Sequence, residues 1–143
     1  MSNGVPPERS ARGASGTVPT LFIDRDTWSH LLDAELRKAG IPFVAHREVF
    51  EPAALDPQWI AEIGRRGWVA VTRDKNIRRR PNELRAVRKA GVHMFALTSG
   101  NLSAADTAAI IIKAWPAIRR EVAQTPAPAL YSVSRSGDVR LLK

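Results

Sequence analysis

The sequence contains no cysteine among its 143 residues. This absence excludes a disulfide scaffold, a thiolate zinc site, an iron–sulfur cluster and a cysteine nucleophile. A chain without thiols also fits a reducing compartment, where disulfides rarely form. Any metal site in this protein must therefore use ligands other than thiolates.

Long hydrophobic runs are also missing. The most apolar stretch covers residues 108–114, contains Lys113 and is far shorter than the ~18 residues that a membrane-spanning helix needs. Residues 1–16 contain charges without an apolar run, so they lack the features of a signal peptide. From these absences we expect a cytoplasmic protein with no membrane partner.

The composition is otherwise that of an ordinary globular domain. Hydrophobic residues make up 44% and charged residues 25% of the chain, so a core can form. The length suits one domain rather than two. Residues 1–18 are rich in Gly, Ser, Pro and Arg and lack hydrophobic periodicity, which predicts a disordered leader before one domain over residues 19–143.

The excess of positive charge is concentrated in one segment. The whole chain carries a formal net charge of +8, whereas residues 1–72 hold eight basic and nine acidic groups. Residues 73–89 hold eight basic and two acidic groups, a net charge of +6. Such a concentration indicates a polyanionic partner such as nucleic acid, although a solvated basic helix has the same signature. The candidate nucleic-acid-binding residues are Arg73, Lys75, Arg78, Arg79, Arg80 and Arg85.

Apolar strand-like segments alternate with helical segments through most of the chain. Strands are predicted at residues 20–23, 42–45, 68–72 and 92–97. Helices are predicted from Asp26 or Thr27 as N-cap to about Ala39, and at residues 57–66, 81–90 and 104–123. This order predicts the α/β class, with a mainly parallel sheet covered on both faces. A Ser-Gly-Asp turn between residues 130–134 and 139–142 predicts a C-terminal β-hairpin.

Carboxylates follow several of the predicted strands. Asp24 and Asp26 come directly after the first strand, Asp56 begins the helix after the second, and Asp74 follows the third. Because the carboxyl ends of parallel strands meet at one edge of a sheet, we expect these acids to converge. Clustered carboxylates repel one another unless a cation joins them, and their hard oxygen ligands suit Mg²⁺ or Mn²⁺.

A divalent ion beside a basic segment suits phosphodiester hydrolysis. The ion polarises the phosphoryl oxygen and activates a water, while Lys and Arg hold the flanking phosphates. Simpler interpretations stay open for some of these residues: Asp26 and Asp56 are also plausible helix caps, and Asn101 either contacts the site or only shapes its turn. The four tryptophans fall at core-facing positions and indicate packing rather than base stacking.

The sequence resembles PIN-like domains of the VapC-type toxin group over about residues 20–143. The resemblance is carried by FIDRD at 22–26, DPQWI at 56–60, GWVAVTRDKNIRRRPNEL at 67–84, LTSGNLS at 97–103 and YSVSRSGDVRLL at 131–142. It implies a three-layer α/β/α sandwich with Mg²⁺ or Mn²⁺ held by strand-end acids. It also implies endoribonuclease activity on RNA, a cognate antitoxin that restrains this activity, and a possible homodimer.

The resemblance assigns roles to individual acids. Asp24 matches the first-strand acid, Asp74 the acid of the TRD motif and Asp56 the acid ahead of the second long helix. These three are the predicted catalytic and metal-binding residues. The family's fourth position carries no acid here, and Asn101, Glu83 and Asp26 are the remaining candidates for the metal site.

Two other functions fit parts of the pattern. A non-catalytic RNA-binding or antitoxin-bound module would use the same acids only as helix caps. A phosphorylation receiver also pairs acids after its first strand, places one after its third and a threonine after its fourth, as Thr98 is here. The receiver needs a lysine after a fifth strand, which has no match in this sequence.

Overall fold

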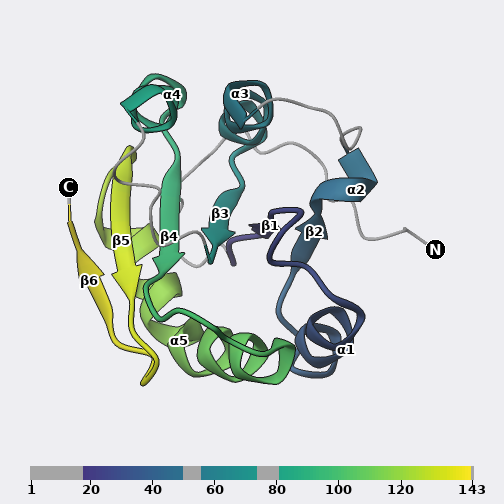
Figure 1. Cartoon of the computed structure of the whole chain (residues 1–143). Helices are drawn as coiled ribbons and strands as arrows, with labels where there is room; N and C mark the ends of the chain where they lie inside the picture. The colour runs from purple at the N-terminus through teal and green to yellow at the C-terminus, as the bar shows by residue number, and fades with distance from the viewer. Residues whose placement is uncertain (1–17, 50–55, 74–80, 143) are drawn as a thin grey trace.

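The computed structural model describes residues 18–49, 56–73 and 81–142, with only the backbone of residues 56–58. Its centre is a six-stranded sheet (Figure 1). The strands are β1 (Leu21–Ile23), β2 (Phe43–Ala45), β3 (Val69–Thr72), β4 (His93–Leu97), β5 (Ala129–Val133) and β6 (Val139–Leu141). The helices are α1 (His30–Lys38), α2 (His46–Val49), α3 (Asp56–Arg66), α4 (Pro81–Ala90) and α5 (Ala104–Gln124).

The sheet has the strand order β2-β1-β3-β4-β5-β6. All neighbouring pairs from β2 to β5 are parallel, and β6 returns antiparallel beside β5. This arrangement confirms the predicted α/β class, the mainly parallel sheet and the C-terminal β-hairpin. The predicted leader lies outside the described residues, apart from Val18.

Helices cover both faces of the sheet, which makes a three-layer α/β/α sandwich. In Figure 1, α1 and α5 lie below the sheet, and α3 and α4 lie above it. Successive side chains of a strand point to opposite faces of the sheet. In β1 these side chains, Leu21, Phe22 and Ile23, are all apolar and all buried, as expected for a strand covered on both faces.

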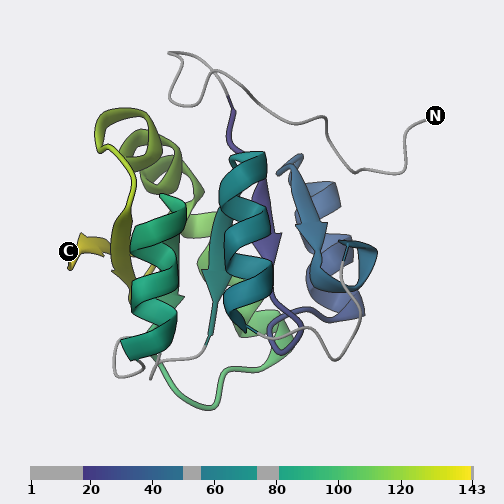
Figure 2. The same cartoon turned by 90° about the horizontal axis from the view of Figure 1, so that it is seen from above.

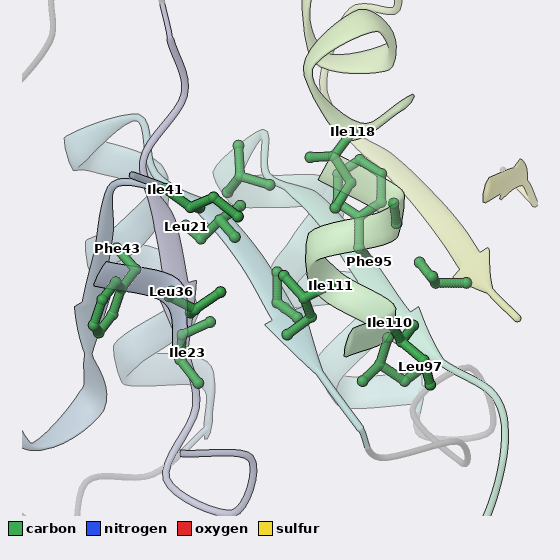
Figure 3. Packing of buried hydrophobic residues seen from close by; sticks show 14 of the residues in the cluster. Leu21, Ile23, Leu36, Ile41, Phe43, Phe95, Leu97, Ile110, Ile111 and Ile118 are labelled. Carbon is green, nitrogen blue, oxygen red and sulfur yellow. The ribbon is translucent and has the colours of Figure 1, made fainter. Parts of the chain in front are cut away.

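Two hydrophobic clusters follow from this alternation. The cluster below the sheet joins β1 and β4 to the apolar face of α5, as Figure 3 shows for Leu21, Ile23, Phe95, Leu97, Ile110, Ile111 and Ile118. The cluster above the sheet contains the opposite strand face and Trp59, Ile60, Ile63, Trp68 and Val87. Two of the four tryptophans, Trp59 and Trp68, are therefore core residues, as predicted.

The start of α1 differs from the prediction. The N-cap is Ser29, whose hydroxyl accepts a hydrogen bond from the Leu32 N–H at 3.0 Å, so the assignment of the cap to Asp26 or Thr27 is wrong. The reason is a turn: the N–H groups of Thr27 and Trp28 both donate to the Asp24 carbonyl at 3.1 Å. This turn uses residues 24–28 and delays the helix.

The other helix starts agree more closely with the sequence. Ser103 and Asp106 form a capping box at the start of α5, which continues through Pro116 to Gln124. The short helix α2 was not predicted, since four residues are too few for a periodic pattern. None of the helices described is long and apolar enough to cross a membrane.

From β1, the chain adds β2 on one side of the strand and then returns to add β3 on the other side. The gap between β1 and β3 is therefore a topological switch point. In open parallel sheets, ligands bind outside the carboxyl ends of the strands at such a switch point. Figure 2 shows the turn after β1 and the loop after β4 at the same end of the sheet. The switch point therefore lies beside Asp24, the first of the predicted acids.

Candidate active site

Asp24 stands at the switch point, one residue beyond the end of β1. Its Oδ1 accepts a hydrogen bond from the Thr27 N–H at 3.0 Å, and its Oδ2 accepts one from the Thr72 hydroxyl at 2.7 Å. Thr72 is the last residue of β3, the strand next to β1. The carboxylate is therefore fixed between the two strands that define the crevice.

The surroundings of the Asp24 carboxyl change its pKa. Burial raises its pKa above the usual value, while hydrogen bonds from Thr27 and Thr72 act in the opposite direction and the nearby Asp26 charge adds to the increase. A carboxylate that has lost part of its hydration gains from a cation, since a cation offsets the desolvation of its negative charge.

Neighbouring loops are tied to the same place by hydrogen bonds. The Arg73 N–H donates to the buried Thr27 hydroxyl at 3.0 Å, which joins the segment after β3 to the turn after β1. The Arg73 guanidinium donates through Nη1 to the Leu102 carbonyl at 3.1 Å, in the loop between β4 and α5. Three strand-end segments thus meet around Asp24.

The other predicted metal ligands are placed less fully. Asp56 is the first residue of α3, which agrees with a helix-start position, but its side chain lies outside the described residues. Asp74 also lies outside them, one residue beyond Arg73. Asp26 is in the turn after β1 with a side chain that is 84% exposed, and it pairs with Arg25 at 3.8 Å.

Glu83 and Asn101 are the remaining candidates. Glu83 is half-buried in the first turn of α4. Asn101 is exposed in the loop after β4 and has a φ of 56°, a left-handed conformation that asparagine tolerates better than most residues. This backbone supports the turn-shaping interpretation of Asn101, and its contact with a metal stays a prediction.

Two of the six predicted RNA-binding residues are described. Arg73 is exposed beside Asp24, and Arg85 is exposed on α4, where it donates to the Asn82 side chain at 3.1 Å. Lys75, Arg78, Arg79 and Arg80 lie outside the described residues. The sequence reasoning missed the threonines Thr27 and Thr72, although the position of Thr72, immediately before the Arg-Asp pair, was a usable signal.

The donors at this edge fit a hard divalent cation in their chemistry. The described part of the site offers the Asp24 carboxylate with hydroxyl groups around it, and oxygen ligands are those that Mg²⁺ and Mn²⁺ prefer. Among the described residues no three His, Cys, Asp or Glu side chains lie close enough together to hold a metal ion. A complete ligand set would need Asp74 or Asp56.

The structure thus belongs to the class of α/β/α sandwiches whose candidate site lies at the carboxyl ends of parallel strands. Comparisons with known proteins agree with that class. Residues 19–99 match the family model described as "PIN like domain". The chain therefore belongs to the PIN-like domain family, as its resemblance to VapC-type proteins indicated.

One curated relative covers most of the chain. "Putative ribonuclease VapC45" from Mycobacterium tuberculosis (strain ATCC 25618 / H37Rv) is 32% identical over 126 residues, which is 85% of this chain and 91% of that protein. No solved structure matches the chain. The relative supports a VapC-type PIN domain protein over most of the chain.

Proposed function

We propose that this protein is a metal-dependent endoribonuclease and the toxin of a type II toxin–antitoxin system. The single observation that carries the proposal is the Asp24 carboxylate, fixed by Thr27 and Thr72 at the switch point of the sheet. Membership of the PIN-like family and similarity to a protein named as a VapC ribonuclease support it.

In this proposal, Asp24, Asp74 and Asp56 hold Mg²⁺ or Mn²⁺. A bound divalent ion supplies positive charge against the charge that develops on the phosphoryl oxygens, and it lowers the pKa of a coordinated water. Thr72 and Thr27 keep the Asp24 carboxylate in one orientation, so little reorganisation is needed when substrate binds. Asp26, Glu83 and Asn101 are the candidates for a further ligand.

The proposed partner surfaces follow from charge. Arg73 and Arg85, together with Lys75, Arg78, Arg79 and Arg80, bind RNA phosphates beside the carboxylate edge. The proposed protein partners are a cognate antitoxin and a second copy of the chain, and the proposed location is the cytoplasm. In this assignment the acids cut RNA while the basic residues hold it.

The direct test is RNA cleavage by carboxamide variants. Asp24→Asn and Asp74→Asn should each lower the cleavage rate by at least ~10²-fold, because loss of one carboxylate weakens both metal binding and charge stabilisation. Cleavage is measured on a labelled RNA with Mg²⁺ or Mn²⁺, and folding is checked by circular dichroism.

Asp138→Asn is the matched control, because Asp138 is an exposed acid in the hairpin turn whose side chain accepts a hydrogen bond from its neighbour Ser136. It should cleave at the parental rate. Parental rates for both Asp24→Asn and Asp74→Asn would refute the site. A folded parent protein that binds RNA but cleaves none with either metal would favour the non-catalytic module.

A further inference from the structure

An arginine outside the basic segment stands beside the candidate active site. Arg47 is an exposed residue of α2, directly after β2. Its guanidinium carbon lies 3.9 Å from the centre of the Trp28 ring, the shortest such cation–π contact among the described residues. This contact holds a long, flexible side chain in one place.

Trp28 is itself held firmly. Its indole N–H donates to Asp33 Oδ2 at 3.1 Å, and the His30 ring meets it edge-on at 4.8 Å between centroids. The rest of the indole is partly buried against the cluster below the sheet. The ring is therefore a rigid platform, and the interpretation of Trp28 as packing alone leaves its contact with Arg47 unexplained.

Among the residues that the structure describes, none accepts a hydrogen bond from the Arg47 guanidinium. Other arginines are neutralised by carboxylates, as Arg37 is by Asp33 and Arg66 is by Glu62. Within the described part of the chain, Arg47 makes no hydrogen bond and no ion pair, and the Trp28 ring is its one recorded contact. A guanidinium over a ring uses its face, so its N–H groups remain free in their own plane.

The position of this pair places it next to Asp24. The backbone N–H of Trp28 donates to the Asp24 carbonyl at 3.1 Å, and Ile23 pairs with Ala45 across β1 and β2. Asp24 is the next residue after Ile23, and Arg47 is the second after Ala45. Arg47 thus follows the strand on one side of β1, and Arg73 follows the strand on the other side.

We propose that Arg47 binds a backbone phosphate of RNA, with Trp28 as the residue that positions it. The inference rests on the proposed function, since it extends the RNA path across Asp24 toward β2. An ordered, unneutralised guanidinium is suited to phosphate, which it meets with parallel N–H donors. A contact with phosphate adds affinity without sequence preference.

The test is RNA binding in EDTA, where cleavage cannot interfere. Arg47→Gln should weaken binding of a fluorescently labelled single-stranded RNA by roughly 10-fold or more, as expected for the loss of one charge-assisted contact. It should also lower the slope of log affinity against log salt by about 0.7, as expected for one lost phosphate contact on a single strand.

Arg119→Gln is the matched control. Arg119 is also an exposed arginine near a half-buried tryptophan, 5.9 Å from the Trp115 ring, but it lies in the last third of α5, away from the strand-end site. Arg119→Gln removes the same charge as Arg47→Gln. It should leave the RNA affinity within about twofold of the parent and the salt slope unchanged, because distant charges are screened. Thermal unfolding shows whether the two variants are equally stable.

Trp28 is tested through its effect on Arg47. Trp28→Phe keeps a ring beneath the guanidinium and should retain most of the affinity, whereas Trp28→Leu should weaken binding about as much as Arg47→Gln. The double variant should lose little more, since both changes remove one contact.

Parental affinity and salt slope in Arg47→Gln would overturn the proposal, as would an equal loss in Arg119→Gln. The two proposals fail separately. If the parent cleaves no RNA with metal but Arg47→Gln still shows the selective loss in EDTA, the nuclease function fails and the phosphate contact stands.

Discussion

At the scale of single residues, the candidate site depends on a carboxylate in an unfavourable place. Asp24 gives up much of its hydration, and two donors from Thr27 and Thr72 only partly replace it. Such a group costs folding free energy in the absence of a cation and repays it when a cation binds. The same burial that makes the site useful should therefore make the metal-free protein less stable.

Asp24→Asn should raise the stability of the metal-free protein. An amide removes the buried charge, can accept from the Thr27 N–H through its oxygen and can donate to the Thr72 hydroxyl, which also accepts. We expect a gain of about 0.5–2 kcal/mol, the usual range for a single stabilising substitution. Urea unfolding at neutral pH in EDTA measures it.

Metal and a control variant complete this experiment. Mn²⁺ or Mg²⁺ should raise the melting temperature of the parent and have little effect on Asp24→Asn, because only a protein that binds the ion is stabilised by it. Asp138→Asn should change the stability by less than ~0.5 kcal/mol, as expected for an exposed position. A less stable Asp24→Asn in EDTA would contradict the cost assigned to this carboxylate.

At the scale of elements, the layer above the sheet depends on a close contact between α3 and α4. A Cβ added at Gly64 of α3 would lie 2.5 Å from the Ala90 carbonyl oxygen and 2.7 Å from the Ala90 Cβ. Glycine at position 64 therefore lets the backbones of the two helices approach. The approach matters to the site, since α4 (Pro81–Ala90) carries the second half of the basic segment over residues 73–89.

Gly64→Ala should destabilise the fold. In an exposed helix interior this change stabilises by about 1 kcal/mol, whereas here the overpacking should cost about 1–3 kcal/mol. Ala61→Gly is the control on the exposed face of the same helix and should cost about 1 kcal/mol. Denaturant unfolding compares them, and a more stable Gly64→Ala would show that α4 moves aside easily.

At the scale of the whole molecule, charge is divided between two tasks. Residues 1–72 are close to neutral overall and provide Asp24, whereas residues 73–89 carry a net charge of +6. In the structure, Arg73 and Arg47 lie on either side of Asp24, one from each of these segments. RNA binding and RNA cleavage should therefore respond to different conditions.

Removal of divalent ions should separate binding from cleavage. With EDTA we expect cleavage to be lost and RNA affinity to fall by no more than a few-fold, because phosphate contacts come from Arg and Lys. Affinity should fall steeply as salt rises, by roughly 10-fold or more between 50 and 200 mM for several phosphate contacts. Affinity that disappears together with the metal would place the main RNA contact on the ion.

The local features of the fold were predictable, and the exceptions have identifiable causes. The apolar runs predicted β3 and β4 to within a residue, and Pro81 and Ala90 are the predicted ends of α4. The predicted start of α1 was wrong because a turn precedes the helix. Hydrogen bonds to the Asp24 carbonyl, rather than the spacing of apolar residues, decide where this turn ends.

The candidate site was predictable only in its acids. Asp24 could be placed at a strand end because strand and acid are adjacent in sequence. Thr72, which donates to it, is 48 residues away, and no local pattern joins the two. The same is true of Trp28 and Arg47, which come from different elements and meet only because β2 pairs with β1.

Three features follow from the sequence alone: the alternation of strands and helices, the acids that follow the strands, and the basic segment. Each depends on residues that are close together in the chain. The strand order, in contrast, could be established only from the folded protein. That order places β1 between β2 and β3, since pairing between distant strands is set by how helices and sheet pack together rather than by any one segment. Asp24 therefore lies between the ends of β2 and β3, with Thr72 and Arg73 on the β3 side and Arg47 on the β2 side.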